Sequence, residues 1–145
     1  MANDLTEKIL NMHDVYLNCT LQKQSMLKSP IPEKVEQYHY CDRGRYERTW
    51  ISFLYVLCEA WTSSRDIQQY ATKSRTGKKL IDIMKRGRLN RKIEEMRKVR
   101  DYMCHRDKRA YWDEGRIAVI NIFQYCINLD SAFSAFFLEA MQSEY

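Results

Sequence analysis

Glycine and proline are scarce in this chain, and that scarcity restricts it to long regular elements. Four glycines and two prolines occur among 145 residues, and apolar residues recur at intervals of three and four rather than in alternation. Such intervals place side chains on one face of an α-helix. The sequence therefore predicts an all-α fold, a bundle of four to six helices, in which residues 1–145 form a single helical domain.

Prolines, glycines and capping side chains mark the ends of the predicted helices. These run from about residue 4 to 26, 45 to 63, 66 to 71, 77 to 87, 89 to 103 and 113 to 142, with a short turn of helix at 33 to 40 and a break at 42–44. The last helix is apolar nearly all round at its end, where Phe133, Phe136 and Leu138 widen its stripe. A helix of that kind lies deep in a bundle or faces a partner chain, so the pattern allows a dimer through this helix.

Composition favours a protein without membrane spans. No run of about eighteen uncharged apolar residues is present to cross a bilayer, and the first residues lack the basic and then apolar order of a secretory signal. The expected location is the cytoplasm. Five cysteines at irregular spacings, with no CxxC pair, indicate neither a disulfide framework nor a zinc site. A metal held by His39 with Cys41, or by Cys104 with His105, is the less favoured alternative.

Positive charge is concentrated in one part of the chain. Between Lys73 and Arg109 there are 15 lysines and arginines against 5 aspartates and glutamates, a net charge of +10. The protein as a whole carries only +5. A block of one sign is often a solvated helix face, but it is also the electrostatic footprint of a nucleic-acid-binding surface.

Within that block lies the hexapeptide Arg100-Asp101-Tyr102-Met103-Cys104-His105. Arginine carries a permanent planar cation suited to phosphate, and histidine exchanges protons near neutral pH. Asp101 and His105 are four residues apart, so on a helix the carboxylate can hold one imidazole nitrogen. Arg100 and His105 point about 140° apart on a regular helix. Both can therefore line one pocket only if the helix ends near Cys104 or a second protein surface closes over them.

An arginine, a polar residue and a histidine at this spacing, near the end of the penultimate long helix of a bundle, resemble the motif of the HEPN domain (higher eukaryotes and prokaryotes nucleotide-binding). The resemblance covers the chain from about Leu89 to the C-terminus, and the first half only in the length of its helices. It implies a metal-independent endoribonuclease without a cofactor, of the toxin or anti-phage defence type. It also implies a homodimer in which two motifs meet in one cleft, and a possible antitoxin or other regulatory partner.

Carried over to this sequence, the resemblance makes Arg100 and His105 catalytic and Asp101 their polar auxiliary. Cleavage would proceed by attack of the RNA's own 2′-hydroxyl, with His105 transferring protons and Arg100 neutralising charge on phosphate. Side chains around the motif are the candidate RNA contacts: Arg97, Lys98, Tyr102, Arg106, Lys108 and Arg109.

Several alternatives stand beside this interpretation. Arg100 can instead pair with an acid inside the bundle, with His105 as a capping or surface residue. Tyr102 and Trp112 can stack on bases or simply pack in the core. The competing function is a non-catalytic helical module that binds another protein or RNA. Nucleotide-cradling glycine loops, His-Glu-x-x-His and Gly-x-Ser-x-Gly are absent from the sequence, which leaves ATPase, metalloprotease and serine-hydrolase functions without support.

Overall fold

Six α-helices make up the part of the chain that the computed structural model describes, residues 2–34, 37–38, 41–104 and 109–143. Side chains are described in these ranges except at 2–3, 104, 109–118, 120 and 143. In chain order the helices are α1 (Ala2–Lys28), α2 (Asp42–Ser63), α3 (Arg65–Ala71), α4 (Arg75–Leu89), α5 (Lys92–Cys104) and α6 (Arg109–Ser143). The predicted all-α helical bundle is confirmed for these residues.

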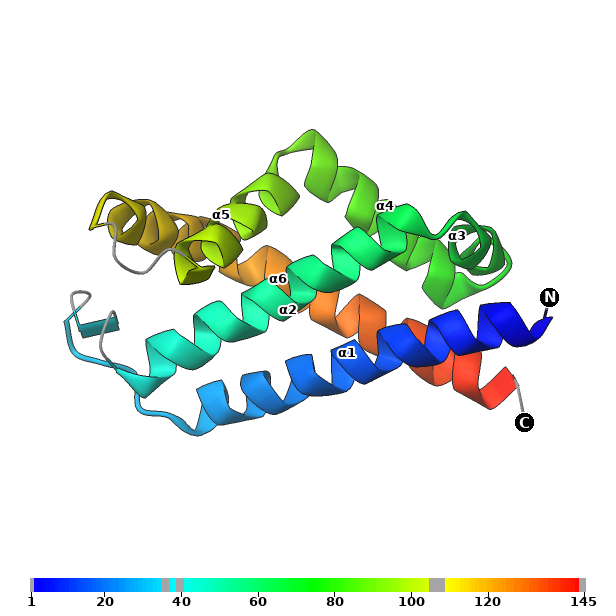
Figure 1. Ribbon diagram of the computed structural model, residues 1–145, viewed down its shortest axis with the longest axis horizontal. Coiled ribbons are helices and arrows are strands. Elements are labelled where there is room, and N and C mark those ends of the chain that lie inside the picture. The colour runs from blue at the N-terminus through cyan, green and yellow to red at the C-terminus, as the bar shows by residue number, and fades with distance from the viewer. Residues whose placement is uncertain (1, 35–36, 39–40, 105–108, 144–145) are drawn as a thin grey trace.

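The framework consists of α1, α2, α5 and α6. α1 packs along α2, α6 crosses behind α2, and α5 packs against both α2 and α6 (Figure 1). α4 lies on α6. The largest buried side chains are Trp50 of α2 and Phe133, Phe136 and Phe137 of α6. Each buried side chain of this size stabilises the fold by roughly 1.5 to 3 kcal/mol relative to an exposed position. The apolar end of α6 is therefore mainly a core element, although Leu138 remains exposed.

The glycines lie inside helices, which corrects the expectation that they punctuate the chain. Gly44 is in the first turn of α2, and Gly77 and Gly87 lie within the 15-residue α4. A Cβ atom at Gly87 would collide with the hydroxyl of Tyr125 on α6, and one at Gly77 would collide with the Ala71 backbone. These glycines are required for close approach of neighbouring segments.

Two other boundaries differ from the sequence prediction. α6 begins at Arg109 rather than near residue 113, and Leu89 ends α4 instead of opening α5. The chain turns between α4 and α5 at Arg91, whose φ of 62° is in the left-handed region. α5 ends at Cys104, where the sequence also predicted a helix end. The short turn predicted at 33–40 falls partly outside the described residues.

One carboxylate lies inside the core. Asp130 of α6 is 2% exposed and accepts hydrogen bonds from Tyr16 Oη of α1 at 3.0 Å and from Trp50 Nε1 of α2 at 2.8 Å. Lys23 Nζ lies 3.5 Å from the same carboxylate. A buried charge is tolerated only when it is paired and hydrogen-bonded, so Asp130 fixes α1 and α2 against α6.

α1 carries apolar side chains on its exposed face as well as on its buried face. Leu10, Leu17 and Leu21 are exposed on the side opposite the buried residues Met12 and Cys19.

Of the helices described here, none is long and apolar enough to cross a membrane.

Candidate active site

The position of Arg100 follows from the buried face of α5. Met96, Val99 and Tyr102 are buried at intervals of three, and this face packs against α2 and α6. Arg100 follows Val99 directly, so its Cα lies at the edge of the buried face beside α2. Its side chain is 33% exposed, which leaves the guanidinium at the surface but in contact with the neighbouring helix.

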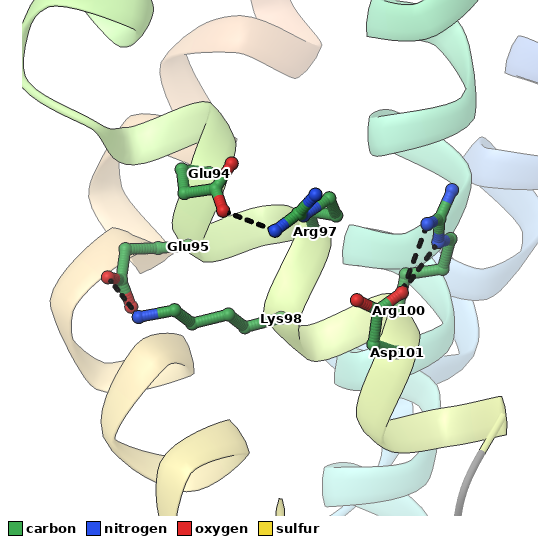
Figure 2. A network of polar contacts seen from close by, with 6 residues as sticks. All are labelled: Glu94, Glu95, Arg97, Lys98, Arg100 and Asp101. Atoms are coloured by element: carbon green, nitrogen blue, oxygen red, sulfur yellow. Dashed lines mark hydrogen bonds and ion pairs between the residues drawn. The ribbon is translucent and has the colours of Figure 1, made fainter.

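The guanidinium of Arg100 is held on three sides. Its Nη1 donates to Glu59 Oε1 of α2 at 2.7 Å. Its Nε and Nη2 both donate to Asp101 Oδ1, at 3.3 and 3.0 Å (Figure 2). The Arg100 Cζ atom also lies 4.6 Å from the ring centroid of Tyr55. Tyr55 and Glu59 are four residues apart and so project from one face of α2 toward the same guanidinium.

The electrostatics of the site follow from these contacts. The hydrogen bond to Asp101 raises the pKa of Arg100 above its ordinary value, and the attraction of Glu59 adds to that effect. Burial raises the pKa of Tyr55, with a further contribution from Glu59 and an opposing one from Arg100. Arg100 therefore remains charged at every pH in which the protein is folded. Tyr55 presents a neutral aromatic face to it, the geometry of a cation–π contact.

Asp101 binds its sequence neighbour Arg100 and orients the guanidinium. Its side chain is 38% exposed, so the carboxylate lies at the surface of α5. The predicted contact between Asp101 and His105 lies outside the described residues.

The remainder of the predicted motif follows the end of α5. His105, Arg106 and Lys108 lie outside the described residues, and Arg109 opens α6 without a described side chain. The direction of the His105 side chain relative to Arg100 therefore also lies outside the described residues.

Two of the predicted RNA contacts are surface cations in ion pairs. Arg97 Nη2 binds Glu94 Oε1 at 2.6 Å, and Lys98 Nζ binds Glu95 Oε1 at 3.2 Å (Figure 2). Both side chains are about half exposed. Exposed pairs at this spacing contribute little to stability and are screened by salt, so a phosphate can compete with either carboxylate.

Tyr102 takes the packing role that the sequence left open. It is 2% exposed, and the guanidinium of Arg48 on α2 lies 5.6 Å from its ring centroid. Burial to this extent favours packing over stacking on an RNA base within one chain. Tyr102 packs α5 against α2 next to Arg100, one of the two roles that the sequence left open.

Tyr55 and Glu59 are the site residues that the sequence did not reveal. They precede Arg100 by more than forty positions and show no motif around them. Only the packing of α2 against α5 brings them to the guanidinium. Within the described part of the chain, no group of three or more histidine, cysteine or acidic side chains is arranged to hold a metal ion.

Comparison of the chain with models of known protein families, with curated protein sequences and with solved structures gives no match. The resemblance to HEPN domains therefore depends on the hexapeptide and the helical architecture alone.

Proposed function

We propose that this protein is a metal-independent endoribonuclease that cleaves RNA through attack of the 2′-hydroxyl, in which Arg100 stabilises the transition state and His105 transfers protons. The observation that carries the proposal is the fixed guanidinium of Arg100 at the end of the helix that leads into His105. A cation held in place before the substrate arrives avoids the cost of reorganisation when charge develops on phosphate.

Arg100 retains donors for a phosphate. A guanidinium has five N–H groups, and three of those on Arg100 are used by Glu59 and Asp101. One N–H on each terminal nitrogen remains, and this pair matches two oxygens of a phosphate. Asp101 acts as a positioning residue, because it binds Nε and Nη2 and leaves the outer edge of the guanidinium open.

The proposed chemistry balances without a cofactor. One imidazole takes the proton of the 2′-hydroxyl as its oxygen attacks phosphorus. The bond from phosphorus to the 5′-oxygen then breaks, and an imidazolium gives a proton to that leaving oxygen. The products are a 2′,3′-cyclic phosphate and a free 5′-hydroxyl. General acid–base transfer of this kind contributes typically ~10² to 10⁴-fold in rate.

Two copies of His105 in one cleft would supply both the base and the acid, so the proposal includes a homodimer. A mixing experiment tests this directly. Wild-type and His105→Ala proteins, unfolded and refolded together in equal amounts, should retain about a quarter of the activity of the same total concentration of wild type, because only dimers with two histidines are active. Light scattering should give twice the monomer mass for each. Catalysis confined to one protomer predicts about half of that activity.

The decisive experiment is cleavage of mixed RNA in EDTA by the wild type, Arg100→Ala and His105→Ala. Arg86→Ala is the matched control, because Arg86 is an exposed arginine in a comparable ion pair with Asp82 on α4. Cleavage should survive chelation, vanish in the two site variants and persist in the control. An RNA with a 2′-deoxy nucleotide at the mapped site should remain intact at that position. RNA left whole by folded wild-type protein would refute the enzyme.

The alternative is a non-catalytic helical module that binds RNA or another protein. The ion pair between Arg100 and Glu59 favours it, since that pair also serves as a link between α5 and α2. Salt-sensitive binding of RNA with no products would identify an RNA-binding module. A toxin or anti-phage role, with an antitoxin partner, belongs to the enzymatic proposal and would appear as growth arrest that depends on Arg100 and His105.

A further inference from the structure

A groove lies between α3 and α4, away from the ion-paired face of α5. α3 contributes Arg65, Gln68, Gln69 and Thr72, and α4 contributes Ile81, Met84, Lys85, Arg88 and Leu89. Each set follows helical spacing, so each forms one continuous wall. The enclosed volume is about 710 Å³, within the range of ligand-binding clefts.

The groove has an apolar floor and a basic rim. Trp61 lies at the floor and is 3% exposed, because its ring packs edge-on against Phe133 and Phe136. Ile81 and Met84 complete the apolar surface, and Leu89 at the rim is 80% exposed. Of the described residues that line the groove, three are cations and none is acidic.

The acids of α4 and α5 do not neutralise this charge. Each of these carboxylates is bound to a cation on its own helix: Asp82 to Arg86, Glu94 to Arg97, Glu95 to Lys98 and Asp101 to Arg100. Arg65 and Lys85 make no ion pair with any residue in the described part of the chain. An excess of positive charge therefore faces the groove, and its occupant should be an anion.

A second pocket lies along α2, next to the residues that hold Arg100. This smaller pocket of about 240 Å³ is lined by Tyr55, Glu59 and Thr62 of α2 and by Ile93 of α5. Tyr55 and Glu59 are the residues that hold Arg100. At the other end, the guanidinium of Arg88 donates to the Thr62 hydroxyl. This hydrogen bond joins a lining residue of the groove to a lining residue of the smaller pocket, and Arg100 lies beside the smaller pocket.

We propose that the groove between α3 and α4 binds the single-stranded RNA that flanks the bond placed at Arg100, with Arg65, Lys85 and Arg88 on its phosphates. The identity of that bond rests on the proposed ribonuclease function; the binding of the strand does not. Tyr55 to Thr62 spans seven residues of α2, about 10 Å, a length that a single strand crosses within a few nucleotides. The groove therefore takes nucleotides a few positions away from the cleaved linkage.

The walls favour RNA over an acidic peptide. Gln69 and Thr72 place an amide and a hydroxyl beside the apolar floor, where they can reach the edges of an unpaired base. Ile81 and the exposed Leu89 offer apolar surface to a base or ribose. Arg65, Lys85 and Arg88 at the groove, with Arg100 beyond it, supply several cations to a phosphate backbone.

The test compares two pairs of substitutions that remove the same charge. Arg65→Ala with Lys85→Ala removes two of the three cations that line the groove, while Lys73→Ala with Lys78→Ala removes two exposed cations that do not line it. The probe is a fluorescent twelve-nucleotide single strand of 2′-O-methyl RNA, which binds but cannot be cleaved. Its affinity is measured by anisotropy over a series of salt concentrations.

Loss of two phosphate contacts should reduce the slope of log affinity against log salt by about 1.4, since each contact on a single strand contributes about 0.7. The groove pair should show this reduction, and the control pair should keep the wild-type slope. With cleavable RNA, the groove pair should raise KM and leave kcat within about twofold.

Equal slopes for the two pairs would overturn the proposal, since they would mean that charge is read over the whole surface. A poly-glutamate peptide of equal charge is the second probe. The proposal is also overturned if the groove pair lowers the affinity for this peptide but leaves the affinity for RNA unchanged. If the wild type cleaves RNA and the groove pair binds RNA as the wild type does, the ribonuclease proposal stands and the groove proposal is refuted. If the groove pair shows the reduced slope but the wild type cleaves no RNA, the groove proposal stands and the ribonuclease proposal is refuted.

Discussion

Arg100 of α5 and Glu59 of α2 are joined by a hydrogen bond of 2.7 Å between Nη1 and Oε1, across 41 residues of sequence. The carboxylates of Glu59 and Asp101 both bind the single positive charge of Arg100, so these three side chains carry a net negative charge in the absence of RNA. A phosphate that binds the two remaining N–H groups of Arg100 is therefore repelled by the nearby carboxylate of Glu59.

Glu59→Gln should strengthen RNA binding. Removing this charge from a partly exposed pair is expected to raise affinity about threefold, or ~0.6 kcal/mol, at low salt. Asp82→Asn, which breaks the exposed pair with Arg86, is the control for the change in net charge. The measurement is anisotropy with uncleavable RNA. Identical affinities for the two variants would mean that Arg100 does not bind phosphate.

Asp130→Ala should be strongly destabilising. Asp130 accepts from Trp50 and Tyr16 in the core and lies near Lys23, and loss of one partner from such a buried network costs ~3 kcal/mol or more. Tyr16→Phe removes a single hydrogen bond and should cost ~1 kcal/mol. Urea unfolding measures both. A loss below 1 kcal/mol for Asp130→Ala would show that the carboxylate is not a structural centre of the bundle.

Stability should fall in alkaline solution because three thiols are buried. Burial raises the pKa of Cys58 to about 12 and also raises the pKa values of Cys19 and Cys126 above the ordinary 9.0. Above pH 9 the unfolded chain loses these protons while the folded protein retains them, so stability that is complete below pH 9 declines as the pH rises. Each thiol contributes a slope of about 1.4 kcal/mol per pH unit at most.

Urea unfolding at pH 8, 9, 10 and 10.5 measures this decline. Cys58→Ala should be less stable than the wild type at pH 8 because it leaves a small cavity, but its stability should fall less steeply above pH 9. An equal slope in the two proteins would mean that Cys58 ionises in the folded state as it does in the unfolded chain.

The turn between α4 and α5 should tolerate glycine and reject a β-branched residue. Arg91 has a φ of 62°, a conformation that costs most residues about 1 to 2 kcal/mol and costs glycine little. Arg91→Gly is expected to leave stability unchanged or raise it by up to ~1 kcal/mol, and Arg91→Val to lower it by ~1 to 2 kcal/mol. Thermal unfolding checks the order of the three proteins, and Arg91→Val at wild-type stability would contradict it.

The sequence by itself determined the helices and most of their inward faces. Phe133 and Phe136, which the sequence places on the apolar surface of the last helix, are buried, because helical periodicity is a local property that neighbouring residues fix together.

Tertiary structure alone decided which side chains meet. Position 87 needs glycine because Tyr125 of α6 approaches it closely. The Tyr102 ring packs beside Arg48 of α2, and Arg100 binds Glu59 of the same helix. The groove between α3 and α4 likewise combines residues whose separate sequences show only ordinary amphipathic spacing. Such contacts depend on how helices distant in sequence pack, a choice made by the summed burial of the whole core rather than by any short segment.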